Sequence, residues 1–313
     1  MNGLIIINKP SGITSYTVVK RVRKILKVRK AGHTGTLDPF AQGILVVCFN
    51  EGTKLASFLA GEDKEYLGML RLGIETDTQD ITGRVIKDNS PAHISTSQIQ
   101  MAFENFQGKI MQVPPMYSAL KHNGVPLYRL ARKGEKIERS PREVEIKRLS
   151  IEKIDSPKVF FRVICSKGTY IRTLANDLGN FLGCGACLEM LNRTRSGSFR
   201  IEDSITLENL ERTSLKEVEE KWIISPSRAL SFWQEIIVDE EIARKLYQGK
   251  TIRGLELKGK NETGLNLKGK IKILTPGGDL IAIAEAFNHM PLDLNKPVWK
   301  LLRVFNPERQ AGF

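Results

Sequence analysis

The stretch AGHTGTLDPFAQG, residues 31–43, combines three glycines, one histidine, two threonines and an Asp-Pro step. Gly32 and Gly35 allow another molecule to approach the backbone closely, because glycine has no side chain. Pro39 restricts Asp38 to an extended or turn conformation. The stretch therefore offers one carboxylate in an open loop, and Asp38 is a candidate nucleophile or general base. By itself, an Asp-Pro turn is more often structural than catalytic.

The segments on either side of this stretch predict a basic helix and apolar strands. Upstream, apolar residues recur at helical spacing over 18–26, with Thr14 or Ser15 as the N-cap. Lysines and arginines fill the other positions from Lys20 to Lys30. A basic helix face is commonly just solvated, but this one leads directly into the candidate loop. The strands predicted beside this helix are GLIIINK (3–9) and GILVVCF (43–49).

Further along the chain, strand and helix patterns follow each other without the regular alternation of βαβ units. This favours an α+β fold with a mixed, largely antiparallel sheet flanked by helices over a doubly wound one. Ser97 and Thr169 are the predicted N-caps of two of the helices. Strands are predicted at 64–73, 84–87, 159–168 and 186–199, and helices at 53–61, 97–107 and 169–183.

Residues 112–145 differ in character from their surroundings. Prolines, glycines and basic residues surround two tyrosines, and only Leu127 to Arg132 has a helical pattern. Because loops of this length inside a compact domain are usually functional or disordered, we interpret the segment as a mobile basic insertion. An ordinary surface excursion is the simpler alternative.

A polar stretch over 211–222, followed by SPSRALSFW, indicates a domain boundary near residues 225–235. We therefore expect a first domain over 1–230 and a second, smaller one over 231–313. The second domain is predicted to contain a capped helix at 239–250, two strands joined by a Pro-Gly-Gly turn within 269–287, a final strand at 299–305, and a near-repeat of GLELKGK (254–260) as GLNLKGK (264–270).

The charge of the chain favours a polyanionic partner. Lysine and arginine number 48 against 35 aspartates and glutamates, which gives a formal charge of +13. Nucleic acid is the first candidate for such a partner. The apolar runs are too short to span a bilayer and the four cysteines are too few for a disulfide scaffold, so we expect a cytoplasmic protein.

The usual signatures of metal and cofactor sites are missing from the sequence. Cys184 and Cys187 have CxxC spacing, but a second pair of ligands is absent, so we expect buried structural thiols. The histidines lack metal-ligand spacing, and no GxxxxGK[ST], GxGxxG or GxSxG motif occurs. We therefore expect neither a metal nor a cofactor.

The opening stretch resembles the catalytic motif of the TruB family, the bacterial tRNA pseudouridine synthases. The resemblance continues in the family's order through KEYLGMLRLGIETDTQDITG, VPPMYSALKHNGVPLYRLAR, CSKGTYIRTLANDLG and LGCGACLEMLNRTRSGSF. It implies a pseudouridine synthase catalytic domain over 1–230, with an RNA-binding insertion at about 112–145. LTPGGDLIAIAEA and LLRVF are similar to the small PUA-like β domain of bacterial members, which implies a PUA-like RNA-binding domain over 231–313.

The resemblance also implies a reaction and a substrate. Members of the family isomerise uridine to pseudouridine at position 55 in the T-loop of tRNA, by breaking the glycosidic bond of a flipped-out base and rejoining it through C5. No cofactor, redox change or metal is needed. The partner implied is the folded T stem-loop, and nothing in the sequence requires more than a monomer.

The family's site residues map onto matching positions of this sequence. Asp38 matches the catalytic carboxylate, acting either as nucleophile at C1′ or as base at C2′. Burial would raise its pKa, so a cation should accompany it, and Arg172 matches the family's arginine at that place. The resemblance further implies that Tyr66 stacks on the base and takes part in proton transfer, that Tyr170 and Leu191 line the pocket, and that His33 fills the space left by the flipped base.

Two other functions fit parts of the same sequence. A non-catalytic RNA-binding or tRNA-folding module would use the same basic faces, but the joint presence of Asp38, Tyr66 and Arg172 speaks against it. A guide-RNA-dependent pseudouridine synthase would share the aspartate motif. The small C-terminal domain and the lack of charged tails favour the stand-alone bacterial type.

Overall fold

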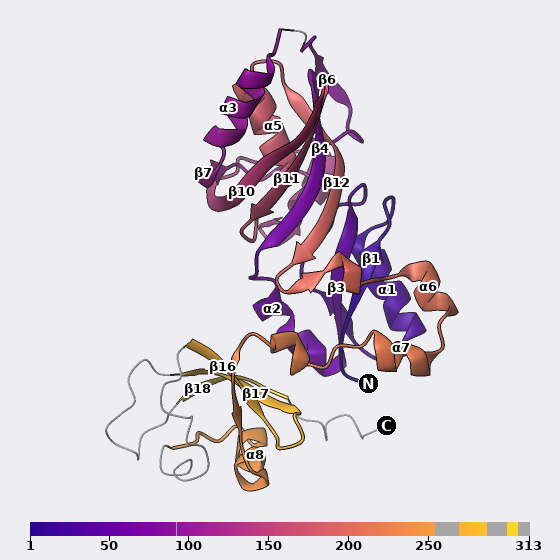
Figure 1. Cartoon of the computed structure of the whole chain (residues 1–313), viewed down its shortest axis with the longest axis vertical. Coiled ribbons are helices and arrows are strands. Elements are labelled where there is room, and N and C mark those ends of the chain that lie inside the picture. The colour runs from indigo at the N-terminus through magenta and orange to yellow at the C-terminus, as the bar shows by residue number, and fades with distance from the viewer. Residues whose placement is uncertain (92, 254–268, 287–298, 306–313) are drawn as a thin grey trace.

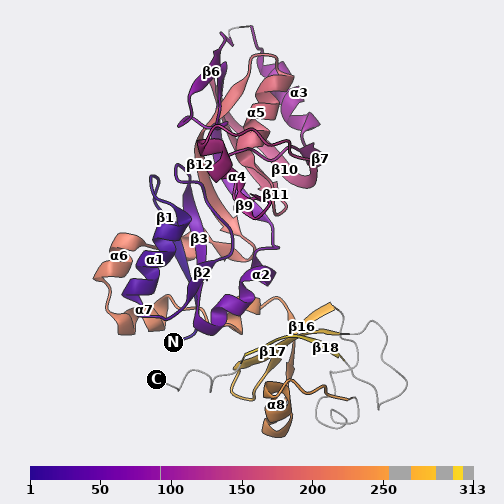
Figure 2. The ribbon, with the colours of Figure 1, turned by 180° about the vertical axis from the view of Figure 1, so that it is seen from behind.

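Residues 1–91, 93–253, 269–286 and 299–305 are described by a computed structural model of the chain. The molecule is elongated, with the helices α3 (Thr96–Asn105) and α5 (Ile171–Phe181) at one end, α1 (Ser15–Ile25) in the middle and a small sheet at the other end (Figures 1 and 2). Among the described residues, no helix is long and apolar enough to cross a membrane.

One sheet of ten strands forms the main body. Adjacent strands of this sheet are antiparallel except in the pairs β1–β14 and β12–β3. This confirms the predicted mixed, largely antiparallel sheet. Its strands, in spatial order, are β14 (Ile205–Thr206), β1 (Gly3–Lys9), β3 (Gln42–Phe49), β12 (Ala186–Ser196), β4 (Lys64–Leu72), β11 (Lys158–Cys165), β10 (Arg142–Asp155) and β7 (Gly108–Gln112), with β2 (Ala31–His33) on β3 and β13 (Phe199–Arg200) on β12.

Two helices, α3 (Thr96–Asn105) and α5 (Ile171–Phe181), pack on one end of this sheet. Phe103 of α3 meets Phe161 of β11 edge to face, with ring centroids 6.0 Å apart. Both helices were predicted, but both predicted N-caps are wrong. Ser95 caps α3 in a capping box with Gln98, because this serine stands three residues before the glutamine that bonds back to it.

The start of α5 also differs from the prediction. Tyr170 occupies the N-cap position without a side-chain hydrogen bond. The hydroxyl of Thr169 donates instead to the carbonyl of Ser166 at 2.9 Å, in the preceding turn. A local bond to an earlier carbonyl competes with capping for a threonine at this position.

Three helices cover the other end of the sheet, where α1 (Ser15–Ile25), α6 (Leu207–Arg212) and α7 (Leu215–Lys221) bury apolar side chains against β1 and β3. Thr14 caps α1, which confirms the predicted basic helix. The polar stretch over 211–222, from which a nearby domain boundary was predicted, contains a helix: Ser214 caps α7, and Val218 is fully buried. The predicted helix at 53–61 forms as a 3-10 turn (Asn50–Leu55) followed by α2 (Ala56–Leu59).

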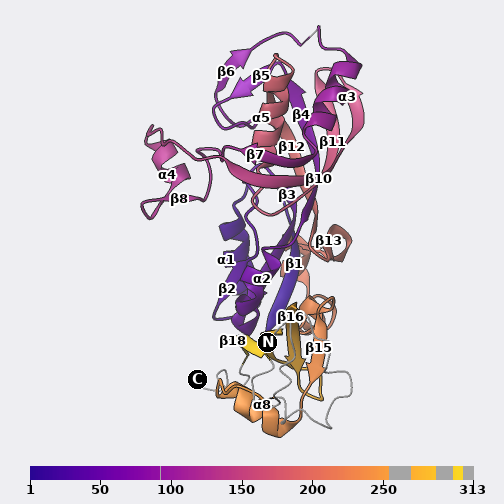
Figure 3. The same cartoon turned by 90° about the vertical axis from the view of Figure 1, so that its left-hand side faces the viewer.

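The insertion over 112–145 has more structure than its sequence predicts. Strands β8 (Lys121–His122) and β9 (Val125–Pro126) form a hairpin whose Asn123-Gly124 turn has positive φ at both residues. This is the backbone that a two-residue hairpin turn requires. The helix α4 (Leu127–Arg132) follows, as predicted. The hairpin and α4 project from the side of the body (Figure 3), and the insertion ends earlier than predicted because β10 starts at Arg142.

A second sheet lies beyond Trp233 and consists of β15 (Gln234–Ile237), β16 (Gly269–Leu274), β17 (Leu280–Ala286) and β18 (Trp299–Val304), with α8 (Glu240–Tyr247) beside it. The strands β16, β17 and β18 and the capped helix were predicted, whereas β15 was not. The near-repeat falls mainly on residues 254–268, outside the described ranges. Leu274, Ile283 and Phe305 share one buried cluster with Leu4 and Ile44 of the large sheet. The division at 230/231 and the PUA-like character of 231–313 stay predictions.

Candidate active site

The loop that carries Asp38 runs from β2 to β3 and is held from three sides. The hydroxyl of Ser15 donates to the carbonyl of Leu37 at 2.9 Å and accepts from the Leu37 N–H at 2.8 Å. The ammonium of Lys9 donates to the carbonyl of Pro39 at 3.2 Å. The N–H of Gly12 donates to the same carbonyl at 2.8 Å. Asp38 therefore stands between two residues that the N-terminal segment fixes.

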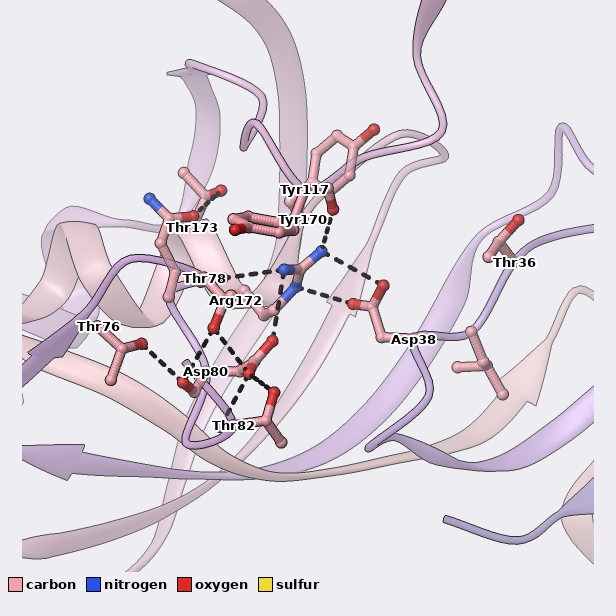
Figure 4. A network of polar contacts seen from close by, with 12 residues as sticks. Thr36, Asp38, Thr76, Thr78, Asp80, Thr82, Tyr117, Tyr170, Arg172 and Thr173 are labelled. Carbon is pink, nitrogen blue, oxygen red and sulfur yellow. Dashed lines mark hydrogen bonds and ion pairs between the residues drawn. The ribbon is translucent and has the colours of Figure 1, made fainter. Parts of the chain in front are cut away.

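Asp38 and Arg172 form an ion pair (Figure 4). Nε of Arg172 lies 2.8 Å from Oδ2 of Asp38, and Nη2 donates to Oδ1 at 3.3 Å. The arginine side chain is 4% exposed and the aspartate side chain 32%. The guanidinium thus comes from inside the protein, and the carboxylate keeps an open side toward solvent.

Arg172 has further partners that fix its plane. Nη1 donates to the carbonyl of Thr78 at 2.9 Å and lies 3.4 Å from Oδ2 of Asp80. Nη2 also donates to the carbonyl of Tyr117 at 2.8 Å, at the base of the insertion. Because the guanidinium is held by oxygens on several elements, it presents a preset pair of donors to Asp38.

Asp80 was missed from the sequence. It lies in the turn between β5 (Ile74–Thr76) and β6 (Val85–Asp88), is almost fully buried, and accepts hydrogen bonds from Thr78, Thr82 and Arg172. An aspartate amid three threonines in TDTQDIT is a signal for a locally bonded turn. Nothing in the stretch indicates its distant arginine.

Opposing influences act on the pKa of Asp38. Burial raises the pKa of Asp38, the charge of Arg172 lowers it, the nearby Asp80 raises it, and the hydrogen bond from Arg172 and the charge of Lys9 lower it. Lys9 is fully buried, and its Nζ donates to the carbonyls of Pro10 and Ile13 as well as Pro39. Burial lowers the pKa of Lys9 to about 8. Arg172 and Lys9 therefore offset only part of the effect of burial, and the pKa of Asp38 stays above its usual value.

The predicted pocket residues Tyr66, Tyr170 and Leu191 lie on β4, at the start of α5 and on β12. Tyr66 of β4 and Leu191 of β12 are buried in the same apolar cluster as Leu37. The ring of Tyr170 lies beside the Arg172 guanidinium (Figure 4). The main chain of Tyr170 is held by the Gln112 side chain through bonds of 3.0 and 3.3 Å. Asp38 raises the pKa of both tyrosines, though burial has the larger effect, which places both phenols within the field of the carboxylate.

His33 lies at the end of β2, opposite Val47 of β3. Its buried Nδ1 has no hydrogen-bond partner among the described residues. Burial lowers the pKa of His33, and the charge of Arg193 lowers it further. The imidazole is therefore neutral near pH 7, which suits a ring that stacks or inserts rather than one that binds phosphate.

The four cysteines lie inside the protein. All four are buried and free of disulfides, as expected for Cys184 and Cys187. Within the described ranges, no group of three or more histidine, cysteine, aspartate or glutamate side chains could hold a metal ion.

The arrangement as a whole suits nucleophilic or general-base chemistry. A half-buried carboxylate paired with a fixed guanidinium keeps its charge and its direction. Two phenols and an apolar wall beside it suit a flat, weakly polar ring. The structure brings together Asp38, Arg172 and Tyr170. It places Tyr66 within the field of Asp38 and Leu191 in the same buried cluster as Leu37, with His33 in the strand that leads into the Asp38 loop.

Two family models together match residues 23–231 of the chain. Residues 23–171 match the TruB family pseudouridylate synthase N-terminal domain. Residues 172–231 match the tRNA pseudouridylate synthase B C-terminal domain.

Curated relatives match over nearly the whole chain. The tRNA pseudouridine synthase B of Geotalea uraniireducens is 44% identical over 312 residues, which is 98% of each chain. That of Geobacter sulfurreducens is 41% identical and covers 98% of this chain and 100% of its own length. That of Clostridium acetobutylicum is 47% identical over 80% of this chain and 84% of its own length.

Solved structures share the fold. A chain in the crystal structure of a Cbf5-Nop10-Gar1 complex has a TM-score of 0.73 and 26% identity, covering 98% of this chain and 86% of that chain. A chain in an H/ACA RNP bound to a substrate RNA containing 2′-deoxyuridine has a TM-score of 0.70 and 25% identity, covering 97% and 85%.

Proposed function

This chain belongs to the TruB family and is a pseudouridine synthase, and we propose that its substrate is uridine 55 in the T-loop of tRNA. The observation that carries the proposal is the ion pair that Arg172 of α5 forms with Asp38 in the loop AGHTGTLDPFAQG. The named relatives act on tRNA, and the excess of positive charge suits that substrate.

Asp38 supplies the carboxylate for the isomerisation. In one route, its oxygen attacks C1′ as the N1–C1′ bond breaks, and the resulting ester is later displaced by C5 of the rotated uracil. In the other, it removes the proton from C2′ to form a glycal, and returns that proton when C5 bonds to C1′. In both routes a proton leaves C5 and N1 gains one, so atoms and electrons balance within one nucleotide.

The neighbouring side chains have complementary roles in this proposal. Arg172 keeps Asp38 ionised and oriented. Tyr66 stacks on the uracil and takes part in moving the C5 proton, while Tyr170 and Leu191 form the other walls of the pocket. The base has to leave its stack to reach them, at a cost of a few kcal/mol. His33, with its neutral ring, occupies the space that the base leaves.

The RNA would lie across α1 and the insertion, which are on the same side of the molecule (Figures 2 and 3). Ser15 ties α1 to the Asp38 loop, and Arg172 ties the base of the insertion to Asp38. A stem-loop that contacts both elements reaches the carboxylate between them. The PUA-like character assigned to residues 231–313 would extend this surface, and one chain is sufficient for the whole site.

A guide-RNA-dependent activity is the second candidate. The observation in its favour is the fold match to the Cbf5-Nop10-Gar1 complex, at a TM-score of 0.73. The curated relatives are more similar in sequence, at 41 to 47% identity against 26%. Activity on a T stem-loop without any added guide RNA separates the two candidates.

The test of the proposed function compares wild type with Asp38→Asn on a T stem-loop transcript labelled with tritium at C5 of uridine. Wild type should release tritium and form pseudouridine, whereas Asp38→Asn should release none and still bind the RNA. Asparagine keeps the turn but lacks the anionic oxygen that either route needs. Asp155→Asn, which changes an exposed aspartate at the end of β10, is the matched control. Turnover by Asp38→Asn near the wild-type rate would contradict the assignment.

A further inference from the structure

Arg193 in β12 is a buried arginine with no carboxylate partner among the described residues. It is 2% exposed, as deeply buried as the apolar residues around it. Removing a cation from water costs several kcal/mol unless other groups compensate for the lost hydration. The role of Arg193 can therefore be inferred from the oxygen atoms that accept its hydrogen bonds.

Three of these oxygens are main-chain carbonyls at the two ends of the Asp38 loop. Nη2 donates to the carbonyl of Gly35 at 3.0 Å, and Nη1 reaches that of Thr36 at 3.5 Å. Nε donates to the carbonyl of Ile44 at 2.8 Å, where β3 has begun. One planar group thus fixes the entry and the exit of the loop relative to each other.

The strand register puts Arg193 next to Tyr66 as well. Arg193 is opposite Gly43 of β3 on one side and opposite Tyr66 of β4 on the other. Gly43 has φ +105°, and a Cβ there would lie 2.3 Å from the carbonyl oxygen of Arg193. A glycine is required at this position for β12 to pack so closely against the loop.

The Arg193 guanidinium also acts on the phenol of Tyr66. Burial raises the pKa of Tyr66, and the charge and the hydrogen bond of Arg193 lower it. Cys165 and Asp38 are the other ionisable groups that face the phenol, and both raise its pKa. Arg193 is the cation that favours ionisation of this phenol, and it also lowers the pKa of Lys9.

We propose that Arg193 is a positioning residue that holds the Asp38 loop and the Tyr66 phenol in one fixed relation, so that both reach the same uridine. The proposal rests on the proposed function, because its task lies within that reaction. The guanidinium acts through the carbonyls of Gly35, Thr36 and Ile44 and through the phenol. A lysine could not replace it fully, because an ammonium is a point charge without the planar fork.

The test uses two variants of this residue and one matched control. Arg193→Gln removes both the charge and the fork, and Arg193→Lys keeps the charge alone. Arg195→Gln changes the next arginine of the same strand. A β-bulge between Arg193 and Arg195 turns Arg195 away, so that it lies 3.4 Å from Glu65 instead. Tritium release in single turnover, RNA affinity and thermal unfolding are measured for each.

We expect Arg193→Gln to lower the single-turnover rate by about 100-fold, since a misplacement of about 1 Å can cost that much. RNA affinity should change by less than about threefold, because Arg193 is buried and does not reach the RNA surface. The single-turnover rate of Arg193→Lys should lie between the rates of Arg193→Gln and wild type. The rate of Arg195→Gln should be close to that of wild type.

The pH profile separates positioning from simple loss of structure. We expect the rate to fall at high pH, where Lys9 loses its charge, and call this fall the alkaline limb. Removing the Arg193 charge raises the pKa of Tyr66 and of Lys9, so the alkaline limb should move to higher pH in Arg193→Gln. Arg193→Lys keeps the charge and should leave the limb in place. If Arg193→Gln does not fold, Arg193→Lys carries the test alone, with a slower rate and an unmoved alkaline limb expected.

The outcomes are distinct. An active wild type with an Arg193→Gln rate within threefold of it overturns the inference and leaves the proposed function intact. A rate loss that matches the fraction unfolded, with no shift of the alkaline limb, also overturns it. Wild type that forms no pseudouridine overturns the proposed function and this inference together.

Discussion

Ser15 and Leu37 bond to each other twice, through one hydroxyl that donates to the Leu37 carbonyl and accepts from the Leu37 N–H. Ser15 is the first residue of the basic helix α1, and Leu37 immediately precedes Asp38. Both bonds are buried. The position of the carboxylate is therefore coupled to a helix that carries four basic residues, Lys20, Arg21, Arg23 and Lys24.

Ser15→Ala should destabilise the fold and slow the reaction. The substitution leaves a buried N–H and a buried carbonyl without partners, at a cost of about 1–3 kcal/mol each. We expect a lower urea midpoint and a single-turnover rate reduced by about tenfold, because the Asp38 loop loses an anchor. Ser11→Ala, which removes one exposed bond to the Phe40 carbonyl, is the control. Equal midpoints for the two variants would contradict this prediction.

The pH dependence of the rate should have two limbs. Asp38 acts as an anion, and burial raises its pKa above 3.8. The rate should therefore fall as pH decreases through that raised pKa. Lys9, with a pKa of about 8, loses its charge and one of its three hydrogen-bond donors above that pH, so the rate should fall there too.

Lys9→Met tests both limbs at once, since it removes the charge with little change in volume. The alkaline limb should disappear, and the acid limb should move to higher pH because Asp38 loses a stabilising cation. The measurement is the single-turnover rate between pH 5 and 10 at constant ionic strength. An alkaline limb that persists in Lys9→Met would assign it to another group.

Asp177→Asn should stabilise the protein at neutral pH. Asp177 lies in α5, forms no ion pair or hydrogen bond within the described part of the chain, and burial raises its pKa to about 6. Its folded pKa lies above the unfolded value of 3.8, so the native state binds more protons between pH 4 and 6 and loses stability as pH rises through that window. The penalty is complete above pH 6.

The matching measurement is urea unfolding of wild type and Asp177→Asn at pH 7 and below pH 4. The variant should be more stable at pH 7, and the difference should shrink at the lower pH, where the wild-type carboxyl is also neutral. Asp155→Asn, at an exposed position, should show no such pattern. A difference that does not change with pH would mean that Asp177 is not the titrating group.

The insertion over 112–145 should become more ordered when RNA binds. Leu127 and Leu130 are its buried anchors, whereas its lysines and arginines are largely exposed. Amide exchange over Leu127 to Gly134 should slow when a T stem-loop binds, because the RNA neutralises and covers the basic side chains. The amides of β4 provide an internal reference. Equal exchange with and without RNA would identify the insertion as rigid.

RNA affinity should depend steeply on salt. Lys20, Arg23, Lys24 and Lys27 are exposed on or next to α1 and form no ion pair with any other described residue, so they are free to meet phosphates. Replacing Lys20 and Lys24 by glutamine should reduce the slope of log affinity against log salt by about 1.5. Lys221→Gln, which breaks an ion pair with Glu217 on α7, should leave the slope unchanged. A flat plot for wild type would contradict the electrostatic surface.

Most of the fold could be predicted because its signals are local. The apolar runs of β1 and β3, the amphipathic pattern of α1 and the Pro-Gly-Gly turn in the small sheet each lie within a few residues. Helix α7 was not predicted, because a single buried residue, Val218, anchors seven mostly charged positions. β10 was not predicted as a strand, because exposed charged side chains such as Arg142 and Glu143 separate its few buried positions.

The site was predicted only where a known motif existed. Asp38 and Arg172 were paired through a family resemblance, although 134 residues separate them along the chain. Asp80, Lys9 and Arg193 were missed because their partners are main-chain carbonyls or distant side chains. A sequence pattern carries no signal for a hydrogen bond to a distant main-chain carbonyl. Every residue has such a carbonyl, and only the folded structure shows which one accepts the bond.

The buried cluster shared by the two sheets has a thermodynamic consequence. Leu4 and Ile44 from the large sheet and Leu274, Ile283 and Phe305 from the small one exclude water from each other. Part of the free energy that folds either sheet is therefore supplied by the other. Heating should therefore unfold the two sheets in a single cooperative transition. A protease that removed the small sheet would leave an exposed apolar patch on the remaining fragment, and that fragment would be prone to aggregate.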